Sequence, residues 1–335
     1  MARHEAVEQG NRGVSRNGRG HAAPARRRWR GLGGWRGWGR WLSAAFAIAV
    51  VALLAWAARQ IDWHEVGDAL RQLPVGVLAA GGALCALSHL IYSGYDLIGK
   101  RWTRHPVPAR RVMLITFISY AFNLNLGSLV GGVAMRLRLY AREGLRHPVP
   151  AKVLALSMAS NWLGYGLLAG GLFLFGWLAP PADWRIGAAA LRGLGALMWA
   201  VVLGYLALCA FSPRREFRLR GHHFFVPSLR IALMQLLIAS ANWLTIGAVL
   251  WVLLQQDVDY GHTLAVLLVA AVAGVITHVP AGLGVLEGVF VAFLGPTLGD
   301  GQVLAALIAY RALYYLAPLA VAAIAYFVLE AKARR

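Results

Sequence analysis

Long apolar segments alternate with short polar loops over most of this chain. Each segment is long enough to cross about 30 Å of hydrocarbon at about 1.5 Å per helical residue. The segments are 41–58, 75–98, 112–135, 151–178, 192–211, 229–254, 263–295 and 303–328. This pattern of eight apolar segments predicts an all-α polytopic membrane protein.

The composition strengthens this interpretation. Of 335 residues, 59% are hydrophobic and only 14% are charged, against about 25% charged in an ordinary soluble domain. The mean hydropathy is +0.57. These values exclude an ordinary soluble domain, a disordered chain and a collagen-like chain. Cys85 and Cys209 both lie within apolar segments, so we expect buried apolar side chains and neither a disulfide framework nor a metal site.

The first 40 residues differ from the rest. They carry ten arginines against Glu5 and Glu8, without apolar periodicity. We predict a disordered basic tail over 1–40, on the cytoplasmic side, whose last part rests on anionic headgroups. A flexible tail without a specific role is the alternative.

Loop charges predict the orientation of the first half. The loop 59–74 is acidic and is expected outside, whereas 99–111 and 136–152 are both basic and are expected in the cytoplasm. The segment between these two basic loops therefore enters and leaves on one side. Its centre holds Asn123, Asn125 and Gly127, which suit a turn at membrane depth. We predict a re-entrant hairpin over about 112–138.

The second half repeats this layout. Its four segments start 151 to 154 residues after those of the first half, and its third segment is broken around His278, Pro280, Gly282 and Gly284. We predict two inverted repeats, 41–178 and 192–330, with about six full transmembrane helices and two re-entrant hairpins in total. Both termini are then cytoplasmic. Coincidental spacing is the alternative.

Glu287 and Arg311 are the notable charges within apolar segments. A charge at the centre of a membrane helix costs roughly 2.5–3.5 kcal/mol or more, so each needs a partner or water. We expect them to pair or to share a cavity, with a structural ion pair as the alternative. The predicted translocation path comprises Asn123, Asn125, Gly127, His278, Pro280, Gly282, Gly284, Glu287, Arg311 and Tyr314.

A basic group follows the first break. Arg138 and Arg142 are one helical turn apart, and guanidinium forks suit phosphate oxygens. With Arg136 and Tyr140 they form a predicted lipid-headgroup site, for which ordinary positive-inside charge is the alternative.

Three further polar residues are predicted to make contacts between helices. These are Asn161 and Asn242, in mid-span, and Asp96. A second hypothesis pairs Asp96 with Lys100, four residues on.

Motifs for catalysis are weak or absent. Gly282-Leu283-Gly284 is no nucleotide loop, since no strand precedes it and no Lys-Ser/Thr follows. His222-His223 has no further ligands at metal spacing. We expect no catalytic residue, no metal, no cofactor and no enzymatic activity.

Two stretches resemble the lysylphosphatidylglycerol synthase transmembrane-region family, which includes the flippase part of MprF and stand-alone YbhN-like membrane proteins. One runs from Asn123 through Arg136-Leu137-Arg138-Leu139-Tyr140 to Gly144-Leu145. The other runs from Pro280 to Glu287 and is followed by Tyr310-Arg311 and Tyr314-Tyr315.

The resemblance implies a lipid translocase of the inner membrane, without the aminoacyl-transferase domain. Its expected substrate is a phospholipid or other envelope lipid with a polar, anionic headgroup. Expected partners are membrane lipids, and a lipid-synthesis enzyme or a second copy of the chain, but no nucleic acid. The alternative is a non-transporting membrane subunit that scaffolds a lipid- or glycan-synthesis complex.

Overall fold

The structure is a computed structural model. It describes residues 63–146, 148–177, 187–213, 216–219, 222–277 and 283–334, with the single positions 48, 52 and 59. The chain divides into two compact units, Met1–Trp56 and Ala57–Arg335, and the second is described here. The predicted tail over 1–40 lies outside the described residues. The two predicted repeats share the second unit, and their boundary stays a prediction.

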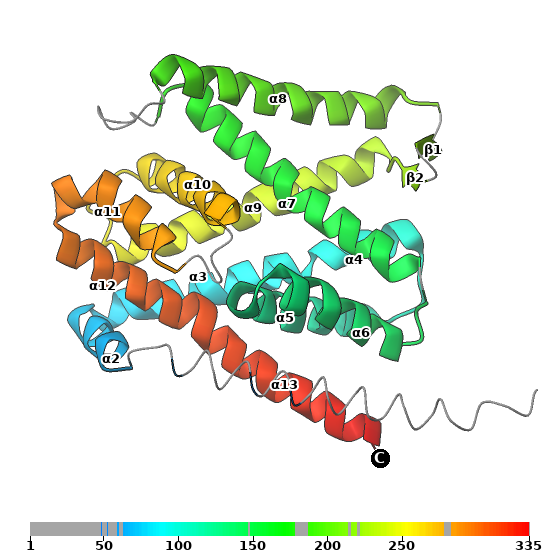
Figure 1. The fold of residues 1–335 in the computed structure, drawn as a ribbon, viewed down its shortest axis with the longest axis horizontal. Coiled ribbons are helices and arrows are strands. Elements are labelled where there is room, and N and C mark those ends of the chain that lie inside the picture. The colour runs from blue at the N-terminus through cyan, green and yellow to red at the C-terminus, as the bar shows by residue number, and fades with distance from the viewer. Residues whose placement is uncertain are drawn as a thin grey trace, which may run out of the picture. The chain divides into compact units, whose positions relative to one another are not determined.

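The described part of the second unit is mostly helical, as predicted (Figure 1). Its first elements, in chain order, are α2 (Trp63–Gln72), α3 (Val75–Ser93), α4 (Tyr95–Thr103), α5 (Ala109–Leu126), η1 (Ser128–Ala134), α6 (Met135–Arg142) and α7 (Val149–Leu174). The later elements are α8 (Ala188–Phe211), β1 (Glu216–Leu219), β2 (His222–Phe225), α9 (Leu229–Leu253), α10 (Tyr260–Thr277), α11 (Val285–Leu298), α12 (Asp300–Tyr310), η3 (Arg311–Leu316) and α13 (Ala317–Arg334).

Six stretches are long and apolar enough to cross a membrane. They are Val75–Thr103, Val149–Leu174, Ala188–Phe211, Leu229–Leu253, Tyr260–Thr277 and Asp300–Ala331. Five of them coincide with helices predicted to cross. The remaining stretch, α10, was predicted as one arm of the second hairpin. Most of the segment 41–58, which was also predicted to cross, lies outside the described residues.

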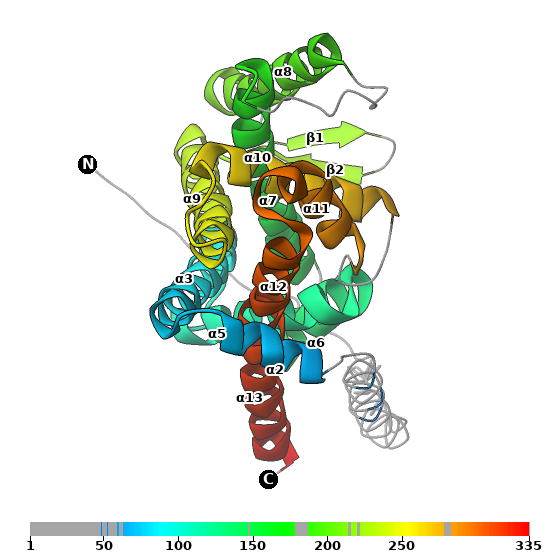
Figure 2. The same cartoon turned by 90° about the vertical axis from the view of Figure 1, so that its left-hand side faces the viewer.

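One pair of short strands departs from the all-α prediction within the described residues. β1 and β2 pair antiparallel, with Glu216 opposite Phe225 and Leu219 opposite His222. They lie in the basic stretch between α8 and α9 (Figure 2).

The core forms where helices distant in sequence pack together. α9 packs along α3, α7 and α10, and α8 covers the far side of α7 (Figures 1 and 2). Buried side chains from these helices join those of α11 and α12, among them Leu250, Leu268, Phe290 and Leu307. Several other apolar side chains are exposed, including Leu203 on α8 and Leu237 on α9, as expected for helices that face lipid.

The chain from α5 to α6 forms a helical hairpin. Gly127 follows the end of α5 with a φ of 82°, which few residues other than glycine adopt, and η1 returns along α5. The return is so close that a Cβ atom on Gly131 would overlap the backbone of Phe122 and Asn123. Glycine at 131 is therefore what lets the two arms touch.

A second helical hairpin joins α10 and α11, which pack against each other. Its connection, 278–282, lies outside the described residues. The predicted positions His278, Pro280 and Gly282 fall there. Gly284, two residues after this connection, has a φ of 77° and is the N-cap residue of α11.

We predict that Gly131→Ala destabilises the protein by about 1–3 kcal/mol or more, because overpacking against backbone leaves no side chain to move aside. The melting temperature of the detergent-purified protein measures this. Gly82→Ala is the matched control, since a Cβ on Gly82 meets nothing within 4 Å. Equal melting temperatures for the two variants would contradict the tight hairpin.

Candidate functional site

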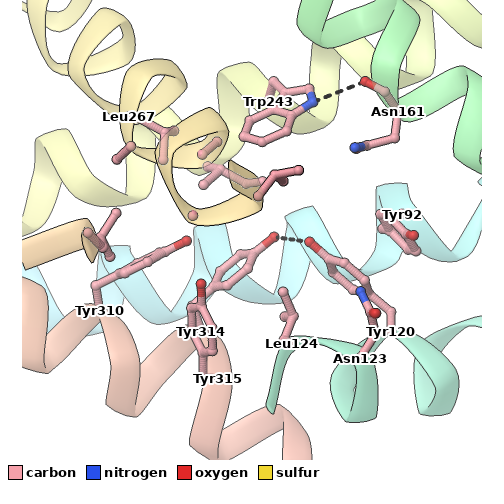
Figure 3. Close-up of a pocket in the computed structure, with 16 residues that line it drawn as sticks. Tyr92, Tyr120, Asn123, Leu124, Asn161, Trp243, Leu267, Tyr310, Tyr314 and Tyr315 are labelled. Atoms are coloured by element: carbon pink, nitrogen blue, oxygen red, sulfur yellow. Dashed lines mark hydrogen bonds between the residues drawn. The ribbon is translucent and has the colours of Figure 1, made fainter. Parts of the chain in front are cut away.

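A cavity of about 320 Å³ lies where the two hairpins come together (Figure 3). The α5 end of the first hairpin contributes Asn123 and Leu124. The second hairpin contributes Val275, from the end of α10, and Leu286, from the start of α11. Residues of α3, α7, α9, α12 and η3 complete the wall. The cavity thus joins the ends of two hairpins that lie about 150 residues apart in the sequence.

Hydroxyl, amide and indole groups interrupt the otherwise apolar wall of this cavity. Its polar and aromatic lining residues are Tyr92, Tyr120, Asn123, Asn161, Trp243, Tyr310, Tyr314 and Tyr315. Trp243 Nε1 donates to the backbone oxygen of Asn161 at 3.4 Å. This bond links α9 to α7 and leaves the Asn161 side chain pointing towards the cavity (Figure 3).

Buried hydrogen bonds that begin at the cavity wall connect the two halves of the chain. The hydroxyl groups of Tyr120 and Tyr314 are 3.0 Å apart, and Ser88 Oγ lies 2.8 Å from the Tyr314 hydroxyl. Ser88 Oγ also donates to Asn242 Oδ1 at 2.8 Å. Asn242, predicted to bond between helices, therefore joins α9 to α3.

Glu287 and Arg311 form the ion pair that the sequence analysis expected. Arg311 Nη2 donates to Glu287 Oε2 at 2.9 Å, and Arg311 Nε donates to Glu287 Oε1. Glu287 Oε2 also accepts the Gly284 amide at 2.9 Å, which caps α11. Leu286 and Tyr310, their sequence neighbours, both line the cavity. The carboxylate thus connects α11, at its first turn, to η3 beside the cavity.

η3 is π-helical, and it carries Arg311, Tyr314 and Tyr315. π-helical turns are rare and concentrate at functional sites. The Asn125 side chain donates to the Tyr315 carbonyl at 3.2 Å and to the Ala121 carbonyl at 2.8 Å. Asn125, predicted in the path, thereby ties the first hairpin to η3.

A second polar cluster lies at the base of the first hairpin. Arg136 Nη1 lies 3.2 Å from Asp96 Oδ1 and 3.1 Å from Ser157 Oγ, and the Tyr140 hydroxyl donates to Asp96 Oδ2 at 2.8 Å. The side chains of Arg136 and Asp96 are 3% and 0% exposed. The cluster connects α4, α6 and α7.

This geometry confirms Asp96 as a contact between helices, excludes its pairing with Lys100 and corrects the expected place of Arg136 and Tyr140. Asp96 pairs with Arg136, whereas Lys100 donates to the carbonyls of His105 and Val107 at 2.8 and 2.6 Å. Arg136 and Tyr140 were predicted to face lipid headgroups, but both are buried against Asp96. The reason is that a buried carboxylate needs a close cation and hydrogen bonds, and α6 supplies them.

The other two predicted arginines lie nearer the surface. Arg138 Nη2 and Arg142 Nη2 lie 3.3 and 2.5 Å from Glu330 Oε2. Glu330 comes from α13, which runs past α5 and α6 (Figure 1). Two cations thus share one carboxylate, and the group keeps a formal charge of +1.

Residues 41–322 match the family described as the lysylphosphatidylglycerol synthase TM region. The chain belongs to this family. It is 44% identical over 302 residues to the inner membrane protein YbhN of Escherichia coli (strain K12), covering 90% of this chain and 95% of that protein. The family and the apolar helices identify a multi-pass inner-membrane protein.

Two further relatives place the chain within the family. An uncharacterized protein of Synechocystis sp. is 28% identical over 260 residues, covering 77% of this chain and 80% of that protein. The phosphatidylglycerol lysyltransferase of Staphylococcus haemolyticus is 24% identical over 299 residues, covering 84% of this chain. This chain spans 33% of that enzyme's length.

Several residues of the site were missed from the sequence. Tyr92 and Tyr120 stack with ring centroids 3.5 Å apart, and Tyr92 lies 5.9 Å from the Arg136 guanidinium. Glu330 also went unnoticed, because it sits in the polar C-terminal stretch. The sequence signal that could have identified Glu330 is an acidic residue just after the apolar segment 303–328. The sequence held no comparable signal for Tyr92 and Tyr120.

His105 lies beside the Asp96 cluster, in the loop after α4. It is 5% exposed, and neither ring nitrogen has a hydrogen-bond partner among the described residues. Burial lowers its pKa below the ordinary value of 6.5, Lys100 lowers the pKa further, and Asp96 raises it. The neutral form is therefore favoured in the folded protein.

We predict that acid destabilises this family member partly through His105. The unfolded chain takes up the proton first as the pH falls below about 6.5, so His105 lowers the free energy of unfolding there. Melting temperatures at pH 7.5 and pH 5.5 measure the effect, which His105→Phe should reduce. The same pH difference in both proteins would exclude His105 as a contributor.

We predict that Arg136→Met lowers the free energy of unfolding by about 3–5 kcal/mol, because Asp96 is left buried without its cation. The double variant Asp96→Asn/Arg136→Met should lose less than the two single losses together. Arg111→Met, which breaks the exposed Arg111–Glu143 pair at 3.9 Å, should cost about 0–1 kcal/mol. Denaturant titration in detergent measures the free energy of unfolding of these three variants and of the single variant Asp96→Asn. Strict additivity would contradict a coupled pair.

Proposed function

We propose that this protein is a lipid translocase that moves a polar-headed lipid between leaflets of the inner membrane, with an anionic phospholipid as the expected substrate. The observation that carries the proposal is the cavity of about 320 Å³ between the ends of two helical hairpins, whose wall combines polar and apolar side chains. This volume falls at the lower end of the range of ligand pockets. A headgroup fits such a space while its acyl chains stay in the lipid.

We further propose that both hairpins are re-entrant and that the two halves form an inverted repeat. α3 and α9 start 154 residues apart, at Val75 and Leu229. They run antiparallel, because Gly81 lies against Leu253 while Gly94 lies against Ile238. A two-fold axis brings equivalent residues together, and the bonded pair Ser88 and Asn242 is also 154 residues apart.

The chemistry of the cavity suits a passing headgroup. Non-helical backbone is tolerated at membrane depth only where protein buries it or a wet cavity borders it. Hydroxyl and amide groups there can replace the water that a headgroup loses. The ion pair Glu287–Arg311 joins the second hairpin to η3, and we propose that its opening and closing lets a headgroup pass.

Arg138 and Arg142 are proposed to collect the headgroup from the cytoplasmic leaflet. Their shared partner Glu330 leaves one positive charge in excess, and guanidinium groups bind phosphate oxygens in pairs. Arg136 has a different role in this proposal, since it holds Asp96 within the fold.

The relatives support lipid handling without fixing the substrate. One of them is a phosphatidylglycerol lysyltransferase, a protein that by its name acts on a lipid with an anionic headgroup. We propose that the present chain translocates lipid across the membrane and catalyses no lysyl transfer. We also propose cytoplasmic termini, membrane lipids as partners, and a lipid-synthesis enzyme or a second copy as an additional partner.

The test is translocation in proteoliposomes. Headgroup-labelled phosphatidylglycerol and a neutral lipid are compared in vesicles with wild type, Glu287→Gln or Arg311→Met. We expect selective transport of phosphatidylglycerol by wild type. We expect at least a tenfold slower rate in either variant, because each leaves the ion pair beside the cavity unmatched.

Glu143→Gln is the control, because it removes an acid of the exposed pair with Arg111. It should transport like wild type. All proteins are first shown to be folded by melting temperature. Equal rates with and without folded protein, for both lipids, would contradict translocation of these lipids and favour the scaffold hypothesis.

A further inference from the structure

We infer that the groove between α3–α4 and α9 is a resident binding site for one anionic phospholipid, separate from the cavity. The groove measures about 700 Å³ and shares no lining residue with the cavity. Its wall is apolar except at one end, where Lys100 and Arg101 line it. An apolar groove that ends in cations matches the build of a phospholipid.

The length of the groove fits one leaflet. Its α3–α4 wall runs from Leu90 to Arg101, which is about 16 Å at 1.5 Å per helical residue. Half of a hydrocarbon core of about 30 Å is nearly the same length. An acyl chain therefore extends from the basic end towards the middle of the membrane.

The wall itself is open to lipid. Leu90 on α3 and Leu237 on α9 both line the groove, and they are 57% and 75% exposed. Between them the helices approach closely, since a Cβ on Gly94 would meet the Ile238 side chain at 2.8 Å. Gly94 thus lets the two helices pack closely where both line the groove.

Further arginines lie near the basic end without lining the groove. Arg101 lies in the last turn of α4, Ala109 at the start of α5 lines the groove, and exposed Arg110 follows it. Arg230 on α9 lies eight residues before Ile238, which places it level with the end of α4 in the antiparallel register. The acids of these and neighbouring elements, Asp96 and Glu143, are engaged by other arginines.

This excess of positive charge selects an anionic headgroup over a zwitterionic one. Basic pockets between membrane helices bind anionic headgroups in this way. A bound lipid would bridge α3 and α9, the helices that also share the bond between Ser88 and Asn242. The inference rests on the membrane location and not on translocation.

Native mass spectrometry of the full chain, delipidated in detergent and titrated with phosphatidylglycerol or phosphatidylcholine, tests the site. We expect one phosphatidylglycerol to bind more tightly than phosphatidylcholine. Arg101→Gln/Arg230→Gln should weaken phosphatidylglycerol binding about fivefold for each arginine removed, and leave phosphatidylcholine nearly unchanged. Ala241→Phe, which adds a ring to the groove wall, should weaken binding of both lipids.

Arg192→Gln is the matched control, an exposed arginine in the first turns of α8, outside the groove. Melting temperatures show that each variant is folded. Equal affinity of wild type for the two lipids would overturn the inference. The inference would also be overturned if Arg192→Gln weakened phosphatidylglycerol binding as much as Arg101→Gln alone does. Unchanged binding of both lipids in folded Ala241→Phe would overturn it as well. Loss of translocation in Glu287→Gln with this binding intact would separate the two sites.

Discussion

A polar group within an apolar helical protein must find its partner inside the chain, and the rest of this structure depends on that constraint. Asp96 is fully buried, and Arg136, Ser157 and Tyr140 complete its cluster at the foot of the first hairpin. Each such contact joins elements that are distant in sequence. Breaking one leaves a charge without water or counterion, so these contacts fix how the helices pack.

The same constraint explains where irregular backbone occurs. The first hairpin turns at Gly127, and η1 follows that turn. η3 breaks the regular helix beside Arg311, and Asn125 binds one of its carbonyls. Irregular backbone, amide groups and tyrosine hydroxyls therefore gather around one cavity. The headgroup site proposed above would account for this concentration inside an inner-membrane protein.

The sequence predicted the helical architecture, because apolar segment lengths follow from membrane thickness. It also identified the pair Glu287 and Arg311, since two charges in neighbouring apolar segments have few possible partners. Asp96 was correctly predicted to contact another helix, but the second hypothesis, a pair with Lys100, was wrong, because Arg136 comes near Asp96 only after α6 has packed on α4. The tyrosines around the cavity were mostly missed, since their spacing does not distinguish a cavity wall from a core. The roles in transport of the predicted path residues stay predictions.

The central claim is that two hairpins enter the membrane from opposite sides and meet at the cavity. Single cysteines at Arg142, after the first hairpin, and at Asp300, after the second, test it in a chain without Cys85 and Cys209. A membrane-impermeant thiol reagent is applied to intact cells and to inverted vesicles. The account predicts labelling of position 142 only from the cytoplasmic side and of position 300 only from the outside. Labelling of both positions from the same side would contradict it.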